Sequence, residues 1–136
     1  MNIPDHGVSF AAEIAAAIFC SLLAALTLFQ VALVSGARLG RFAWGGQHDV
    51  LPRSLRIGSL VAIALYALLA VVILERAGLV SITRNPTISR YGAWAVTGYS
   101  LLGVGMNFIS RSLPERYLMT PLAIALFGSS LVVALS

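Results

Sequence analysis

Four long apolar stretches dominate the chain, and short segments containing charged residues, glycine or proline separate them. The stretches cover residues 8–35, 52–75, 88–110 and 113–135. As a helix, the first would extend for about 42 Å at about 1.5 Å per residue, whereas a bilayer hydrocarbon core is only about 30 Å thick. We therefore predict an all-α protein: a single domain, residues 1–136, folded as a four-helix transmembrane antiparallel bundle.

Capping residues and proline indicate how the last two predicted helices begin and bend. Thr87 or Ser89 is expected to cap the third helix. Ser112 and Glu115 have the spacing of a capping box, in which each side chain accepts a hydrogen bond from an otherwise free backbone N–H group. Pro121 lies inside the fourth helix, where it removes one hydrogen bond and is expected to produce a kink.

The composition explains why these helices are expected in a membrane. Hydrophobic residues make up 59% of the 136 residues and charged residues 10%, and the mean hydropathy is +0.91. A small soluble domain has too much surface for its volume to hide so many apolar side chains from water. Disorder is excluded as well, because disordered chains combine low hydrophobicity with high charge. The chain is thus predicted to be an integral membrane protein.

The positive charge is carried by arginine alone. Nine arginines, no lysine and five acidic residues give a net charge of +4. The arginines lie singly or in pairs between apolar stretches, which is typical of topology signals and of contacts with lipid head groups rather than of nucleic-acid binding. We therefore expect membrane lipids, including anionic ones, as partners, and no nucleic acid.

The arginines are distributed unequally between the two ends of the predicted bundle. The first and third loops contain six of them: Arg38, Arg41, Arg53, Arg56, Arg111 and Arg116. The other three lie in or beside the second loop, on the same side as both termini: Arg76, Arg84 and Arg90. Positively charged residues favour the cytoplasmic side of a membrane. We therefore predict a multi-pass protein of the bacterial inner (plasma) membrane with both termini outside the cytoplasm.

Small residues recur along the predicted helices, where they allow helices to pack closely in a membrane. Gly58 and Ala62 lie on the second helix, and Gly98, Gly103 and Gly105 lie on the third. This pattern fits either packing within the bundle or a face for self-association. A homo-oligomer is favoured if the protein transports a substrate, because four helices alone enclose little space.

Glu13 is the only acidic residue in the interior of an apolar stretch. A carboxylate within a membrane is costly and by default indicates a proton or cation site. However, Glu13 lies only roughly 6 Å from the outer start of an overlong helix. Two interpretations therefore stay open: a proton-coupling residue, or a residue in the head-group region near Arg90 or Arg76.

A second group of polar residues is expected near the cytoplasmic ends of the helices. Gln30, Ser59 and Asn107 lie at comparable depths on the first three helices. Arg56 lies one turn nearer the cytoplasm than Ser59, and Arg111 follows the third helix. The group predicts either a polar cavity that opens toward the cytoplasm, or hydrogen bonds between helices that fix their register.

The sequence predicts no catalytic, cofactor or metal site. His48 and Asp49 are adjacent in the first loop, but without a nucleophile beside them they make a weak acid–base pair. His6 is predicted on the opposite side of the membrane, and Cys20 lies within the first helix. No cluster of metal ligands is therefore expected.

Two resemblances add to this interpretation. The small size, the four spans, the early glutamate in Ala-Glu-Ile and residues 93–98 (AWAVTG) resemble the small multidrug resistance transporters, although the long first loop departs from that family. This resemblance implies functional roles for Glu13, as the essential acid, and for Trp94. Separately, residues 42–59 and 106–121 resemble small bacterial four-span membrane proteins, which implies a fold but no particular activity.

Together these patterns favour a small, non-enzymatic integral membrane protein that binds lipid or a partner, or assembles with one, at the cytoplasmic face. The candidate ligand or lipid residues are Gln30, Arg56, Ser59, Asn107 and Arg111. The alternative is a proton-coupled small-molecule transporter that uses Glu13.

Overall fold

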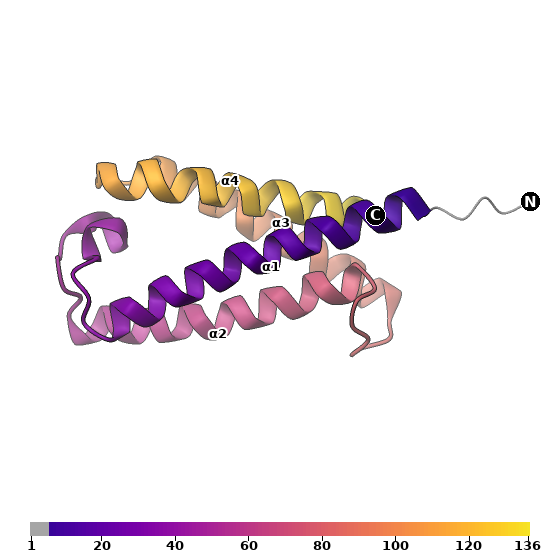
Figure 1. Ribbon diagram of the computed structural model, residues 1–136, viewed down its shortest axis with the longest axis horizontal. Helices are drawn as coiled ribbons and strands as arrows, with labels where there is room; N and C mark the ends of the chain where they lie inside the picture. Colours follow the sequence, from indigo (N-terminus) through magenta and orange to yellow (C-terminus); the bar gives the residue numbers. More distant parts are fainter. Residues whose placement is uncertain (1–5) are drawn as a thin grey trace, which may run out of the picture.

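The computed structural model describes residues 6–136, with side chains from Phe10 onward, and all regular secondary structure in this part of the chain is helical (Figure 1). The four long helices are α1 (His6–Val34), α2 (Arg53–Arg76), α3 (Pro86–Phe108) and α4 (Leu113–Leu135). Two short 3₁₀ helices, η1 (Gly40–Phe42) and η2 (Trp44–Gly46), lie in the first loop. No strand occurs in residues 6–136, which confirms the all-α prediction. Residues 1–5 and the side chain of His6 lie outside the described part.

Three of the described helices are long and apolar enough to cross a membrane: the Phe10–Val34 part of α1, α2 and α4. Length and composition therefore support the prediction of a membrane protein. α3 is not among the three, although it has 23 residues. It contains several glycines and the polar residues Thr97, Ser100 and Asn107, which lower its average hydrophobicity.

The cap of α3 differs from the prediction, whereas the cap of α4 is the predicted residue. Asn85 caps α3, because its Oδ1 accepts hydrogen bonds from the backbone N–H groups of Thr87 (3.0 Å) and Ile88 (3.3 Å). The prediction of Thr87 or Ser89 as the cap is therefore wrong: Pro86 already occupies the first helical position, so the cap must precede it. Ser112 does cap α4 by accepting from the Glu115 N–H group (3.4 Å).

The long helices pack so that each contacts its neighbours in chain order, and α1 also contacts α4. Figure 1 shows that the chain reverses direction between consecutive helices. α1 and α4 lie close together near the end of the molecule where the C-terminus lies, and they diverge toward the other end. The first loop, with η1 and η2, lies at this diverging end and packs against α4.

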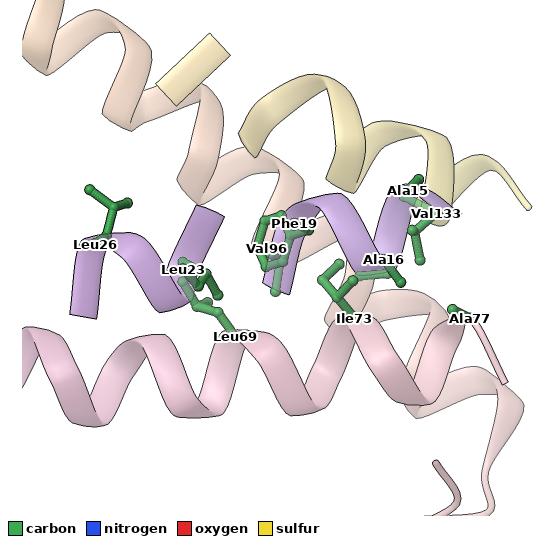
Figure 2. Close-up of a cluster of buried hydrophobic side chains, with 12 residues drawn as sticks. Ala15, Ala16, Phe19, Leu23, Leu26, Leu69, Ile73, Ala77, Val96 and Val133 are labelled. Atoms are coloured by element: carbon green, nitrogen blue, oxygen red, sulfur yellow. The ribbon is translucent and has the colours of Figure 1, made fainter. Parts of the chain in front are cut away.

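The main buried cluster draws residues from all four helices, and Figure 2 shows its side chains. Phe19, Ile73 and Val133 are fully buried in it. Ala16 and Ala93 are also completely buried, so the helix backbones approach closely at these positions. Because lipid is as apolar as these side chains, close packing rather than exclusion of water is what stabilises helix contacts in a membrane. The tight packing positions the cavity described next.

Candidate functional site

A cavity of about 180 Å³ lies between the helices, and residues of all four long helices and of the first loop line it. Along α1 its lining begins at Phe19 and ends at Gln30, which corresponds to roughly 16 Å of helix. The space is far larger than one ordered water molecule requires. Sequence reasoning predicted a polar cavity as one of two interpretations, and Gln30 and Asn107 do line a common cavity.

The two ends of the cavity differ in polarity. Gln30 and Asn107 lie near the ends of α1 and α3, and Glu115 lies in the first turn of α4, all at the diverging end. Phe19 and Leu126 lie toward the middle of their helices, and the lining there is apolar. The cavity therefore fits an elongated molecule with one polar and one apolar end.

Gln30 is a buried polar group at the polar end, with 9% of its surface exposed. Its Nε2 donates a hydrogen bond to the Tyr66 hydroxyl (3.3 Å). Its Oε1 is buried and accepts no hydrogen bond from the described residues. The amide can be assigned in either orientation, but with one hydrogen-bonding partner it leaves a polar group unsatisfied in both. Such a group typically costs about 1–3 kcal/mol, which a ligand or ordered water can recover.

α3 contributes a face of small and polar residues to the cavity. Ser100, Gly103 and Asn107 recur at helical spacing and all three line it. Asn107 donates one hydrogen bond from Nδ2 to the Gly103 carbonyl (2.9 Å), within its own helix. Ser110, three residues after Asn107, lies beyond the helix end and donates to the Glu115 carboxylate.

Trp44 covers the polar end of the cavity from the first loop. Its indole N–H donates to Ser59 Oγ (3.4 Å), and its ring packs on Gly58, where a Cβ would lie only 2.8 Å from the ring. The backbone at Trp44 has a φ of 53°, and Gly45 and Gly46 that follow have φ values of 78° and 70°. Ser59 therefore supports Trp44 rather than lining the cavity itself.

Glu115 joins the first loop to the start of α4. One carboxylate oxygen, Oε2, accepts from the Gly45 N–H group (3.1 Å) and from the Ser110 hydroxyl. The reciprocal half of the predicted capping box is wrong, because the N–H group of Ser112 donates to Ser110 Oγ (3.2 Å) instead of to Glu115. Ser110 thus takes over the capping role, which leaves the Glu115 carboxylate at the cavity.

The candidate arginines are not brought together. Arg56 donates from Nε to the Leu51 carbonyl (2.9 Å), and it does not line the cavity. Arg111 is exposed and lines an open groove outside the cavity, together with His48. Trp44, Asn107 and Glu115 line both the groove and the cavity, so they separate the two.

Glu13 and Trp94, the residues implied by the transporter resemblance, are both exposed. Neither lines the cavity, whose α1 lining begins more than one turn after Glu13. A proton-coupling role for Glu13 stays a prediction.

Sequence reasoning missed the two tyrosines that line the cavity, Tyr66 and Tyr99. Tyr66 could have been predicted from its spacing, because it follows Ser59 by seven residues and so lies on the same face of α2.

No family model, curated protein or solved structure matches this chain. The interpretation of the cavity therefore depends on its geometry.

Proposed function

We propose that this chain is a four-span integral membrane protein that binds an amphipathic small molecule, such as a membrane lipid, in the cavity between its helices. No chemical reaction forms part of the proposal. In this account the protein lies in the bacterial inner membrane as an antiparallel bundle. The first and third loops face the cytoplasm, and together with the helix ends beside them they carry six of the nine arginines.

The pattern of exposure on α3 supports the proposal that this helix also crosses the membrane, in addition to α1, α2 and α4. Its buried positions include the polar Thr97 and Ser100, whereas Leu101, Leu102 and Met106 are each more than half exposed. A helix of 23 residues extends for about 35 Å, which suffices to cross a hydrocarbon core of about 30 Å. The polar residues that lower its average hydrophobicity thus face other helices, and its apolar side chains are left for lipid.

The observation that carries the binding function is Gln30, which is 91% buried, with an unsatisfied amide group, at the polar end of a cavity with an apolar interior. Hydrogen bonds that only fix helix register would satisfy both ends of the amide. An amphipathic molecule that offers a donor near Gln30 and an apolar part near Phe19 matches both ends of the space.

Filling the cavity tests this function. A Cβ added at Gly103, which lines the cavity, meets no atom within 4 Å, so Gly103→Leu projects into the space without a backbone clash. Gly105→Leu is the matched control: Gly105 is exposed and equally open, but it does not line the cavity. Both changes should favour the helix, because leucine has a higher helix propensity than glycine.

The readout is native mass spectrometry of the detergent-solubilised protein with added phosphatidylethanolamine and phosphatidylglycerol. Wild type and Gly105→Leu are expected to retain one bound lipid that resists collisional activation, and Gly103→Leu is expected to lose it. Equal retention by wild type and Gly103→Leu would show that the cavity is not the binding site.

A further inference from the structure

The charge of the cavity lining defines the class of ligand more closely. Glu115 is the only residue with a charged side chain among the lining residues. All nine arginines lie in the described part of the chain, and none lines the cavity. The arginine-rich end of the molecule therefore surrounds a cavity whose own formal charge is negative.

The Glu115 carboxylate is held in place without being neutralised by an arginine. Gly45 and Ser110 donate to its Oε2, and no arginine of the described residues donates a hydrogen bond to it. The adjacent Arg116 instead donates to the Ser110 carbonyl through Nε (3.2 Å) and Nη2 (2.7 Å). Oε1 of Glu115 receives no hydrogen bond from residues 6–136, so one oxygen is left for a ligand.

The amides at this end offer acceptor oxygens, and the hydroxyl groups of Tyr66, Tyr99 and Ser100 can accept or donate. Gln30 has an unsatisfied oxygen, and Asn107 donates one hydrogen bond within α3. The aromatic rings of Trp44, Tyr66 and Tyr99 also line the cavity. Aromatic faces attract cations, and the attraction is stronger where water is excluded. An anion would find only uncharged donors there, and the carboxylate, the Gln30 oxygen and the aromatic faces all disfavour it.

We propose that the ligand is an organic cation: an alkylammonium group whose N–H donors lie beside Glu115 and Gln30 and whose apolar part extends toward Phe19. The inference rests on the proposed binding function and names its ligand class. An ammonium group offers donors and no acceptor, so it complements this lining. It is supplied either by a free alkylamine or by the head group of phosphatidylethanolamine, and the experiment below separates these two sources.

The fluorescence of Trp44 provides a direct readout, because the chain has only two tryptophans and Trp94→Phe leaves Trp44 as the sole reporter. The protein in dodecyl maltoside, an uncharged detergent, is titrated with octylammonium, octanol and octyl phosphate. Octylammonium is expected to bind at least about tenfold more tightly than the other two, the scale of a hydrogen bond to a charged group. A preference for octyl phosphate, or equal affinities, would overturn the inference.

Two variants and a pair of lipids complete the test. Glu115→Gln keeps an oxygen acceptor for Gly45 and Ser110 but removes the charge, so it should abolish the preference for octylammonium over octanol. An unchanged preference in a monomeric, helical Glu115→Gln protein contradicts the role of the carboxylate. Dioctanoyl phosphatidylethanolamine that binds better than dioctanoyl phosphatidylglycerol identifies the lipid head group as the source. Binding of octylammonium with no preference between the two lipids identifies a free amine.

The two proposals fail in different ways. If Gly103→Leu weakens all three octyl compounds equally and wild type shows no preference among them, the cavity binds amphipathic molecules but does not select cations. If neither Gly103→Leu nor Gly105→Leu changes the affinity for any of the three octyl compounds, the proposed binding function itself is wrong.

Discussion

At the scale of single residues, the depth of the glutamine and asparagine of the cavity was predictable, whereas the contacts of the tryptophan and the glutamate were not. Gln30 and Asn107 are isolated amides in apolar helices, where a polar group needs a partner, so their depth alone predicted a shared layer. Arg56 and Arg111 lie on the cytoplasmic side of that layer, but depth does not determine the face, and the two lie apart. The sequence predicted that Glu115 accepts from the Ser112 N–H group in a capping box. That N–H group donates to Ser110 Oγ instead, and this contact depends on how the loop folds.

Gly58 is predicted to set the position of Trp44. A Cβ at Gly58 would lie 2.8 Å from the indole ring, so Gly58→Ala must displace Trp44 from Ser59. We expect a loss of stability of about 1–3 kcal/mol, as for other overpacked sites, despite the better helix propensity of alanine. Chemical unfolding in detergent, monitored by the fluorescence of Trp44 in the Trp94→Phe background, measures both effects.

The matched control for this change is Gly98→Ala. Gly98 is exposed and a Cβ there meets nothing within 4 Å, so the substitution should be neutral or stabilising. Equal stability of Gly58→Ala and Gly98→Ala, with unchanged Trp44 fluorescence, would show that Trp44 does not depend on the glycine.

At the scale of elements, the positions of the helices were predictable from the apolar stretches, because these stretches are longer and more hydrophobic than loops are. The first loop is different: its fold depends on contacts with distant residues. Ser112 donates from its hydroxyl to the Arg41 carbonyl, and Glu115 accepts from Gly45, so the start of α4 shapes the loop. No local pattern encodes such contacts, and the positive φ at Trp44 is unexpected for a non-glycine residue.

The start of α3 provides a test at this scale. Asn85→Ala removes the acceptor for two free N–H groups and should destabilise the protein by about 1 kcal/mol, the usual cost of a lost N-cap. Thr87→Ala, at the position that the sequence alone suggested, should have the smaller effect, because Thr87 is exposed and does not cap the helix. Unfolding midpoints of both variants in the same detergent decide between them, and a larger loss in Thr87→Ala would refute the assigned cap.

At the scale of the whole molecule, α1 and α4 lie close together at one end and diverge at the other, where the first loop lies and lines the cavity (Figure 1). The proposed topology places that cavity-bearing end at the cytoplasmic face.

In a Cys20→Ser background, Ile82→Cys should react with a membrane-impermeant maleimide in intact spheroplasts, whereas Gln47→Cys should react only after lysis. Both positions are exposed, so reactivity reports sidedness. The reverse pattern would invert the topology and place the cavity at the outer face.

The central claim is that a ligand occupies the cavity with its polar end at Glu115 and its apolar end toward Phe19. Crystals grown in a lipidic mesophase and soaked with 8-bromooctylammonium test it, because bromine gives an anomalous signal that marks the end of the alkyl chain. The account predicts one bromine peak among Phe19, Leu23 and Leu126, the apolar part of the lining. Bromine peaks found only on the outer, lipid-facing surface of the helices, with none in the cavity, would contradict it.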